Sequence, residues 1–481
     1  MKRKLFVLLF AVSVITLNAQ VNTNADITTE ELMGHVETLA SEEFAGRKPG
    51  TDGDKKSADY INTQLKALNL TPLCDNGYQS FDVITSLSIG ENQFKCEDFI
   101  GEVGKDYLPI SFSGNNSVLS DVVFVGYGLS VDEENIKWND YANIDVKGKI
   151  VLIMRGAPVF DSAGKFNNYS SLIKKAYTAK DKGAAAVLFV TGEMFDKEDL
   201  FVPLTYEQGQ NSVGIPVIQI TRNSAELILK YFDISLKAIE ANINEVKAPN
   251  SFEVGIKVFV KSEVIKNKVA TQNIVYLMKG EDPVLSDEYI VIGAHYDHLG
   301  MGGKGTGSRV PDTLAVHYGA DDNASGVAAI IEIIEKLKNS GLKLKRSIII
   351  AAFSGEEMGL LGSKYFVNNP PVELNKIKLM FNLDMVGRLN EQTKGLSIGG
   401  VGTAENLKED LEKLISNTGL NAKFSPEGYG PSDHASFYSK NIPVLFLFTG
   451  IHDDYHTPRD IPGKLNYEGE KSVCELVCKV V

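Results

Sequence analysis

The C-terminal half of this chain alternates short apolar strands with amphipathic helices. Four apolar runs have the length of buried strands: Tyr289–Ala294, Ser347–Phe353, Ile377–Leu383 and Pro443–Phe448. Between the first two, Val327–Leu337 repeats its aliphatic residues with the period of a helix. This alternation is typical of strands joined by crossover helices. It predicts an α/β fold with a mixed, mainly parallel sheet covered by helices on both faces.

Two regions of different texture precede this pattern, so we expect segments at residues 27–112, 113–262 and 263–481. The first begins with a helical start at Thr29–Leu32 and continues with a second amphipathic helix over about Gly53–Leu68. In the middle segment, titratable side chains are scattered and no catalytic cluster is expected. Its expected helix and strands are Ser171–Lys182, Val122–Val125, Gly148–Ile153, Ala185–Val190 and Gly214–Ile220.

The N-terminus has the pattern of a signal peptide. Lys2, Arg3 and Lys4 precede the apolar run Leu5–Leu17, and small or polar residues follow up to Ala19. We predict removal of residues 1–19 and an exported, periplasmic or extracellular protein. A membrane anchor or a buried first helix is the alternative. No other apolar run reaches the roughly 18–20 residues that a bilayer span needs.

Charge and cysteine content exclude two classes of protein. The 481 residues carry a formal net charge of −13, whereas binding to a nucleic-acid backbone needs a basic surface. Four cysteines cannot form a disulfide scaffold and show no paired Cys-x-x-Cys spacing. In an exported chain Cys74 and Cys96 could still pair.

Histidines and carboxylates lie just beyond the ends of the expected strands. Each expected strand in the C-terminal half is followed by at least one of them, and a Gly-rich loop before a helix adds two aspartates. The residues are His295, Asp321, Asp322, Glu356, Glu357, Asp384 and His456. Since the carboxyl ends of parallel strands meet at one sheet edge, we expect these side chains to lie together.

Imidazole and carboxylate ligands together suit zinc, and one carboxylate can bridge two metal ions. In the adjacent pair Glu356 and Glu357, one residue can bind metal while the other acts as the general base for water. Each element also has a simpler explanation. An acidic pair at a helix start stabilises the helix dipole, and Asp321-Asp322-Asn323 is typical of a helix N-cap. Their common position at one sheet edge favours the metal site.

These residues belong to five motifs, namely Ala294–Asp297, Gly319–Gly326, Ser354–Ser363, Asn382–Met385 and Tyr455–Pro458. In this order the motifs resemble the co-catalytic di-zinc aminopeptidases, the family that also holds glutamate carboxypeptidases and glutaminyl cyclases. The stretch Leu39–Arg47 resembles the same family. Residues 113–262 are similar to the protease-associated domain often inserted in it. The resemblance implies a zinc-exopeptidase fold with an inserted, smaller, β-rich α/β domain.

The resemblance also implies a role for each matching residue. His295 and Asp384 would bind one zinc ion, Glu357 and His456 the other, and Asp322 rather than Asp321 would bridge the two. Glu356 would be the general base, Tyr455 would donate a hydrogen bond to the oxyanion, and Asp297 would orient His295. His298, His317 and His452 match no ligand position, so a loop or pocket-rim role is expected. His434 and Arg388 are candidates for the substrate pocket.

We therefore expect an exported di-zinc metallopeptidase that removes N-terminal residues from peptides or proteins with a free N-terminus. A carboxypeptidase or dipeptidase of the same family is the alternative enzyme. A carboxypeptidase needs cations for a terminal carboxylate, and only Arg388 is an obvious candidate. A non-catalytic receptor or binding protein is the alternative from another class, and it predicts missing ligands or a missing base.

Overall fold

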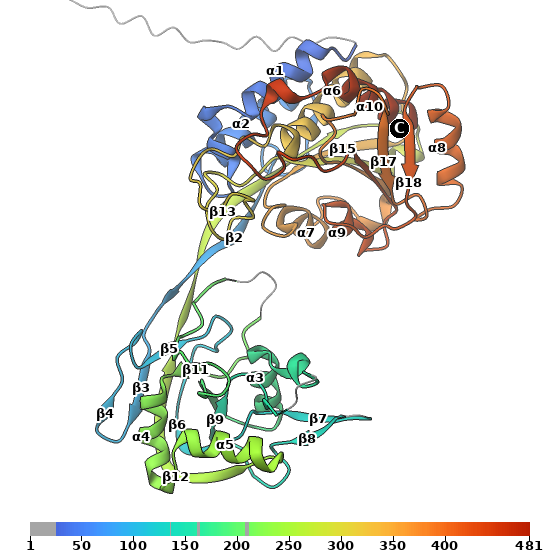
Figure 1. Ribbon diagram of the computed structural model, residues 1–481. Coiled ribbons are helices and arrows are strands. Elements are labelled where there is room, and N and C mark those ends of the chain that lie inside the picture. The colour runs from blue at the N-terminus through green and yellow to red at the C-terminus, as the bar shows by residue number, and fades with distance from the viewer. Residues whose placement is uncertain (1–25, 135, 161–163, 207–210) are drawn as a thin grey trace, which may run out of the picture. The chain divides into compact units, whose positions relative to one another are not determined.

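The structure is a computed structural model that describes residues 26–134, 136–160, 164–206 and 211–481. The predicted signal peptide, residues 1–19, lies outside the described residues. The chain forms two compact units (Figure 1). The larger unit contains the chain up to Val83 together with Ala270–Val481, and the smaller unit is Ile84–Val269. Strands β2 (Tyr78–Ile89) and β13 (Val264–Met278) each begin in one unit and end in the other.

A nine-stranded sheet forms the centre of the larger unit, in the order β1-β13-β15-β14-β16-β19-β17-β18 with β2 paired to β13. The central strands β15, β14, β16 and β19 are parallel, whereas β13 and β17 run antiparallel to their neighbours β15 and β19. The other strands are β1 (Thr71–Pro72), β14 (Tyr289–His295), β15 (Ser347–Phe353), β16 (Ile377–Leu383), β17 (Gly395–Gly399), β18 (Asn421–Phe424) and β19 (Val444–Phe448).

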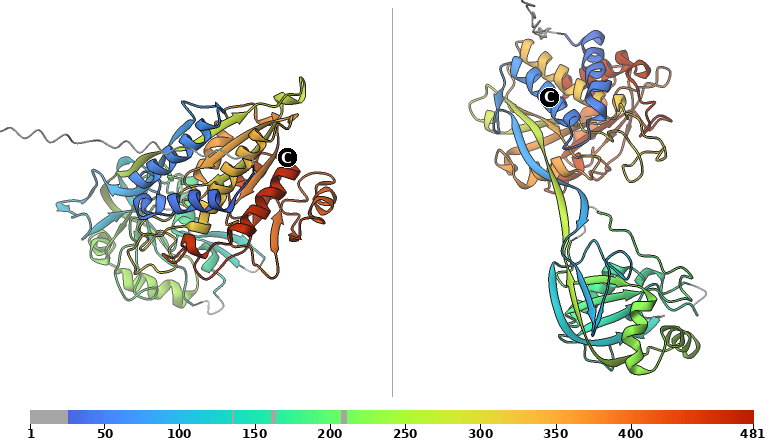
Figure 2. Two further views of the ribbon diagram at one scale, coloured as in Figure 1. Left: turned by 90° about the horizontal axis from the view of Figure 1, so that it is seen from above. Right: turned by 90° about the vertical axis from the view of Figure 1, so that its left-hand side faces the viewer.

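Helices cover both faces of this sheet, and a separate apolar core lies on each side. Ile292 and Ala294 of β14 contribute to the core beneath α1, α6 and α10, whereas Val291 packs with α7 and α9 (Figure 1). Helices α6 and α10 lie side by side (Figure 2). The helices are α1 (Thr29–Leu39), α2 (Asp52–Ala67), α6 (Gly326–Asn339), α7 (Leu361–Asn368), α8 (Leu407–Ile415), α9 (His434–Tyr438) and α10 (Tyr467–Val480).

The smaller unit has an eight-stranded sheet in the order β4-β3-β12-β6-β9-β10-β11-β5 and a separate two-stranded hairpin, β7-β8. Its helices are α3 (Leu172–Asp181), α4 (Arg222–Leu229) and α5 (Leu236–Val246). Its strands are β3 (Gln93–Cys96), β4 (Phe99–Ile100), β5 (Tyr107–Pro109), β6 (Asn116–Val125), β7 (Ser130–Glu133), β8 (Ile136–Asn139), β9 (Ile150–Met154), β10 (Ala186–Val190), β11 (Val217–Ile220) and β12 (Ser251–Ser262).

The predicted α/β class, with a mainly parallel central sheet and a smaller inserted unit, is confirmed. Residues 84–112, which the sequence pattern assigns to the peptidase part, lie in the smaller unit because β3 and β5 pair with β12 and β11. All four cysteines are free thiols. In the part of the chain that the structure describes, we find no helix with the length and apolar character that crossing a bilayer requires.

A candidate metal centre

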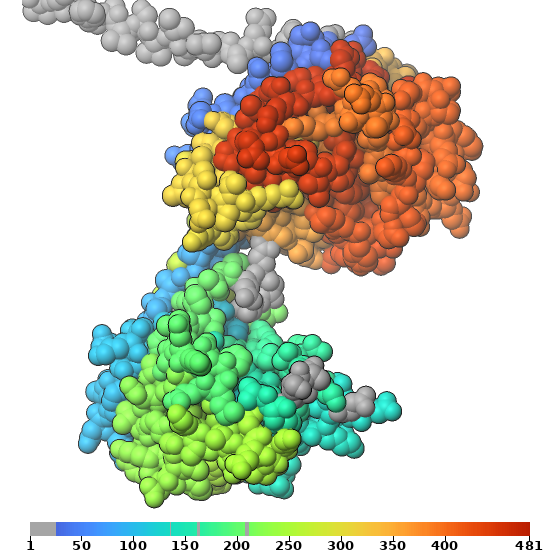
Figure 3. Space-filling view, in the orientation of Figure 1, coloured from blue at the N-terminus to red at the C-terminus, as the bar shows by residue number. Residues whose placement is uncertain are grey.

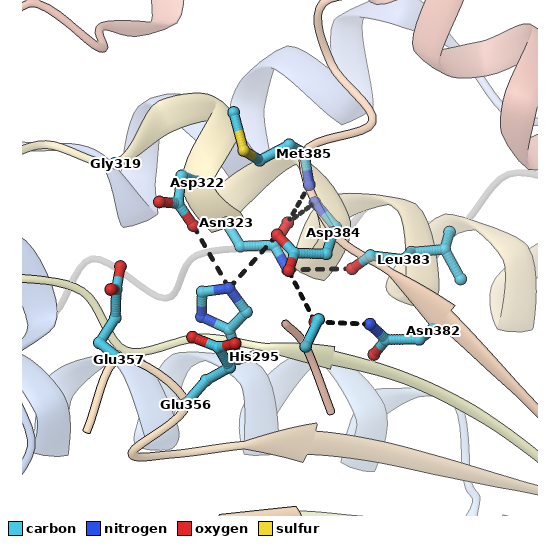
Figure 4. Close-up of polar contacts among 12 residues, drawn as sticks. His295, Gly319, Asp322, Asn323, Glu356, Glu357, Asn382, Leu383, Asp384 and Met385 are labelled. Atoms are coloured by element: carbon cyan, nitrogen blue, oxygen red, sulfur yellow. Dashed lines mark hydrogen bonds and ion pairs between the residues drawn. The ribbon is translucent and has the colours of Figure 1, made fainter. Parts of the chain in front are cut away.

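His295 and Asp384 meet at the carboxyl edge of the large sheet (Figure 4). His295 is the last residue of β14, and Asp384 follows β16, the parallel neighbour of β14. His295 Nε2 lies 3.4 Å from Asp384 Oδ1, and Ser432 Oγ donates to Asp384 Oδ2 at 2.7 Å. Both residues are buried. Strand pairing therefore brings together two ligand candidates that are 89 positions apart in the sequence.

Asp322 lies between two groups of candidate ligands, one around His295 and the other around His456. Its Oδ1 is 3.3 Å from His295 Nε2, and its Oδ2 is 3.2 Å from His456 Nε2. The preceding loop turns at Gly319, where φ is 55° and an added Cβ would lie 2.2 Å from the Asp322 carbonyl oxygen. Only glycine fits this turn. The loop thus aims the two oxygens of one carboxylate at two histidines from different segments of the chain.

Glu357 belongs to the group around His456. Its Oε2 lies 3.2 Å from His456 Nε2, and its Oε1 lies 2.7 Å from His298 Nδ1. His456 Nδ1 faces the Gly307 carbonyl oxygen at 3.0 Å, which fixes the imidazole with Nε2 toward the carboxylates. His298 is buried rather than at a pocket rim, and its place among these groups was not foreseen. The signal for it was a third polar residue in the short run His295-x-Asp297-His298.

The contacts of His295 and His456 fit a metal site better than a hydrogen-bonded cluster, whereas the 2.7 Å contact between His298 and Glu357 has the length of a hydrogen bond. Two ligand atoms about 2.0–2.1 Å from a tetrahedral zinc ion lie about 3.3 Å apart. Hydrogen bonds between charged imidazole and carboxylate are shorter, about 2.7–2.9 Å. The four contacts that Asp322 and its neighbours Glu357 and Asp384 make with His295 and His456 measure 3.2–3.4 Å. The donor set of imidazoles and carboxylates therefore fits zinc.

Asp297 connects the histidine loop to the glutamate pair. Its buried carboxylate accepts hydrogen bonds from the backbone N–H groups of Glu356 at 3.0 Å and Glu357 at 3.3 Å. His295 Nδ1 lies 3.2 Å from the Asp297 carbonyl oxygen and 3.7 Å from its carboxylate. Asp297 is thus placed to orient the imidazole, and it also holds the backbone of both glutamates.

The histidines and carboxylates of the cluster shift one another's pKa values. Burial alone lowers the pKa of His456, but contacts with Asp322 and Glu357 outweigh burial and raise it to about 10. Burial raises the pKa of Glu356 well above its usual range, and its neighbours Asp384 and Glu357 add to the rise. Ligand groups must lose their protons to bind a metal, so binding here would release protons.

The cluster opens into a cavity of about 130 Å³. One side consists of the candidate ligands, Glu356 and Tyr455; the remaining lining is apolar, with Met385, Pro431, Phe446, Phe448 and Ile451. The ring of Tyr455 stacks on the ring of His456, with the two centroids 3.8 Å apart. The Arg309 guanidinium lies 4.8 Å from the centroid of the Tyr455 ring. On the face seen in Figure 3, the yellow Gly-rich loop around residue 305 borders red segments from the end of the chain.

The remaining sequence candidates lie outside this cavity. Arg388 donates to Asp454 at 3.2 Å and to Asp460 at 3.0 Å. His452 Nε2 lies 3.3 Å from Asp321, whose other oxygen accepts from the Gly387 N–H. His317 bonds within its own loop, to Ser308 and Ala315. His434 is buried against the ring of Phe446 and lines a neighbouring hollow.

Known proteins resemble the chain over nearly its whole length. Leucine aminopeptidase 2 of Trichophyton rubrum is 31% identical over 452 residues, which cover 88% of this chain and 73% of that protein. Aminopeptidase YwaD of Bacillus subtilis (strain 168) is 25% identical over 454 residues, covering 92% and 82%. The structure of the aminopeptidase from Aneurinibacillus sp. strain AM-1 covers 94% of this chain and 92% of its own, with a TM-score of 0.52 and 22% identity, and so shares the fold.

Two family profiles match separate parts of the chain. Residues 120–228 match the PA domain, and residues 273–481, which contain all the ligand candidates, match peptidase family M28. The resemblance that the five motifs indicate is thereby confirmed. The chain belongs to peptidase family M28 and carries an inserted PA domain.

Proposed function

We propose that this protein is a zinc-dependent aminopeptidase that holds two metal ions. The observation that carries the proposal is the position of Asp322, whose two carboxylate oxygens face His295 and His456 at 3.3 and 3.2 Å. His295 and Asp384 would hold one ion, His456 and Glu357 would hold the other, and Asp322 would contact both. Zinc ions bound here supply Lewis acidity to the scissile carbonyl group and lower the pKa of the attacking water.

Glu356 is the proposed general base. It lines the cavity but makes no short contact with a histidine, and the ligand atoms that it, His295 and Asp384 offer lie within 4.8 Å of one another. It accepts a proton from the attacking water and passes it to the leaving amine. The Asp297 carboxylate holds the Glu356 backbone in place by accepting a hydrogen bond from the Glu356 N–H group. Tyr455 donates a hydrogen bond to the carbonyl oxygen as negative charge develops there.

The lining of the cavity supports binding of the end of a peptide. The apolar walls formed by Phe446 and Phe448 suit a large aliphatic or aromatic first residue. Two relatives are named aminopeptidases. A carboxypeptidase needs a cation for the terminal carboxylate, and Arg388, the candidate from the sequence, already binds Asp454 and Asp460.

The N-terminus and the inserted domain also have proposed roles. Residues 1–19 are proposed as a signal peptide cleaved after Ala19, which would place the mature enzyme in the periplasm or outside the cell. We assign the peptidase to the larger unit, up to Val83 and from Ala270 onward, and the protease-associated domain to Ile84–Val269, which is wider than the segment 113–262 that the sequence pattern suggests. Export is tested by sequencing the N-terminus of protein recovered outside the cytoplasm.

The experiment that tests the activity compares one leucine-initiated peptide with its N-acetylated form. We expect about two zinc ions per chain, release of leucine from the free peptide alone, and loss of at least 10²-fold in kcat for Glu356→Gln. Glu391→Gln, an exposed glutamate in the same unit, is the matched control. Release of residues from the C-terminus of both peptides would establish the carboxypeptidase instead, and zinc binding without turnover would leave a binding protein.

A further inference from the structure

Arg47 is a fully buried arginine that does not line the cavity, in a segment that the proposed chemistry does not use. Its exposed fraction is 0%, and its guanidinium donates four hydrogen bonds to backbone carbonyl oxygens. Among the described residues, no carboxylate lies within 4.0 Å of it. Burial lowers its pKa to about 10, so the group is still charged at neutral pH.

Three of the four carbonyl groups belong to the loops that carry metal ligands. Nε donates to Tyr296 at 2.7 Å, and Tyr296 lies between His295 and Asp297. Nη1 donates to Tyr318 at 2.7 Å and Nη2 to Gly319 at 2.8 Å, just before Asp322. The fourth bond, from Nη1 to Leu39 at 2.7 Å, ties the side chain to the end of α1.

The main chain around Arg47 also binds the loop that follows His295. The Arg47 carbonyl oxygen accepts from the His298 N–H at 3.3 Å, and the Gly46 carbonyl oxygen accepts from the Gly300 N–H at 2.9 Å. Gly46 has a φ of 70°, and an added Cβ would lie 2.5 Å from the Gly300 carbonyl oxygen. The backbone approaches so closely here that only glycine fits. Side chain and main chain thus join the N-terminal segment to both loops.

We propose that Arg47 is a positioning residue that sets the distance between the His295 loop and the Asp322 loop, and so pre-forms the metal site before metal binds. A planar guanidinium reaches carbonyl groups of both loops at once with donors in a fixed fork, whereas the three donors of a lysine ammonium share one nitrogen atom and lack that geometry. The inference deepens the proposed function and rests on it for the identity of the ligands. The spacing of the two loops is a property of the metal-free protein and can be measured without activity.

The test uses metal-free full-length protein and the variants Arg47→Lys and Arg47→Met. Amide hydrogen exchange is followed in the segments 296–300 and 317–324, with the smaller unit as the internal reference. We expect both variants to exchange at least tenfold faster in both segments and at the wild-type rate in the smaller unit. We also expect the zinc Kd, measured by chelator competition, to rise about 10–100-fold.

Arg222→Lys is the matched control. Arg222 also bonds to backbone carbonyl groups, including Thr191 at 2.8 Å and Lys197 at 3.0 Å, but it lies in the smaller unit. It should leave both loops and the zinc Kd unchanged. Gly46→Ala should reproduce the effect of the Arg47 variants because it disturbs the same junction from the main chain.

Three results would overturn the proposal. Wild-type exchange in both segments would show that Arg47 does not hold the loops. A change in Arg47→Met but not in Arg47→Lys would assign the effect to charge rather than to the shape of the guanidinium. Unfolding of the whole larger unit in Arg47→Lys would make Arg47 a residue of general stability. If the wild-type protein binds no zinc, the proposed function fails, whereas the exchange result still decides the role of Arg47.

Discussion

The Asp460 carboxylate binds the backbone of Asp322 from 138 positions further along the chain. Asp460 Oδ2 accepts hydrogen bonds from the N–H groups of Asp322 at 3.1 Å and of Asp321 at 2.9 Å, and Oδ1 pairs with Arg388. All three aspartates are buried. The loop that places the proposed bridging ligand is therefore held by a carboxylate that itself binds no metal in our proposal.

Replacing Asp460 with alanine should destabilise the protein and weaken metal binding. The change leaves two buried N–H groups without an acceptor, which costs about 2–6 kcal/mol at about 1–3 kcal/mol each. Urea unfolding of the metal-free protein measures the loss. Asp460→Asn keeps one carbonyl oxygen and should lose less. An alanine variant within 0.5 kcal/mol of wild type would contradict this account of the loop.

Asp297→Asn should lower kcat or zinc affinity and destabilise the protein by about 1–3 kcal/mol, the cost of one buried N–H group left without an acceptor. The side chain keeps its size, but one acceptor for the Glu356 and Glu357 N–H groups becomes a donor that faces a donor. We expect a 10–100-fold loss of kcat or of zinc affinity. Steady-state kinetics at saturating zinc separates the two. Full activity with normal zinc content would mean that these two hydrogen bonds do not position the glutamates.

Tyr455→Phe removes one hydroxyl group from the cavity wall and leaves the aromatic stack on His456. If the hydroxyl stabilises charge only in the transition state, kcat should fall about 10²–10³-fold with little change in KM. Arg309→Met removes the cation above the same ring but keeps the hydroxyl group. It is therefore the control for a change in the position of the Tyr455 ring. Equal losses in the two variants would assign the effect to the position of the ring.

Phe448→Ala should change which first residue the enzyme prefers. The ring forms part of the apolar wall, so its removal should reduce kcat/KM for leucine peptides about tenfold or more and have less effect on alanine peptides. Leu342→Ala, an exposed leucine outside the cavity, is the control. A uniform loss for both peptides would show that Phe448 supports the fold rather than the specificity.

Stability should fall on acidification because of His434. Burial lowers the pKa of this histidine from 6.5 to about 4, so the folded state favours the neutral ring. Its contribution is complete above pH 6.5 and is lost as the pH falls toward 4, a change of about 3 kcal/mol. His434→Gln should flatten the dependence of unfolding free energy on pH over this window. Parallel curves for variant and wild type would contradict the assignment.

The sequence predicted the parts of the structure that depend on local pattern. Continuous apolar runs gave Ser347–Phe353 and Ile377–Leu383 with the bounds that the structure has, and the strand order explains why the residues after them converge. Strand β12 was not predicted, although Val254, Ile256, Val258 and Val260 alternate with more exposed residues. That period-two pattern was a readable signal.

Non-local contacts explain what the sequence could not predict. The buried position of His298 depends on how the loop after β14 folds back, and Arg47, 251 positions earlier in the chain, holds that loop. Likewise, nothing near Asp460 in the sequence indicates that it binds the Asp322 loop. Motifs located the candidate ligands, whereas the residues that support them became visible only in three dimensions.

The insertion of the smaller unit has a consequence for biosynthesis. Arg47 bonds to carbonyl groups 249 to 272 positions further along the chain. At about 5–20 residues per second, a ribosome needs roughly 10–50 s to make that stretch. When Tyr296 is made, α1 and α2 have long been complete, whereas most of the strands of their sheet have not been made. The smaller unit, which ends at Val269, is complete by then. Order of synthesis therefore favours folding of the insert first, with the N-terminal helices waiting for their partners.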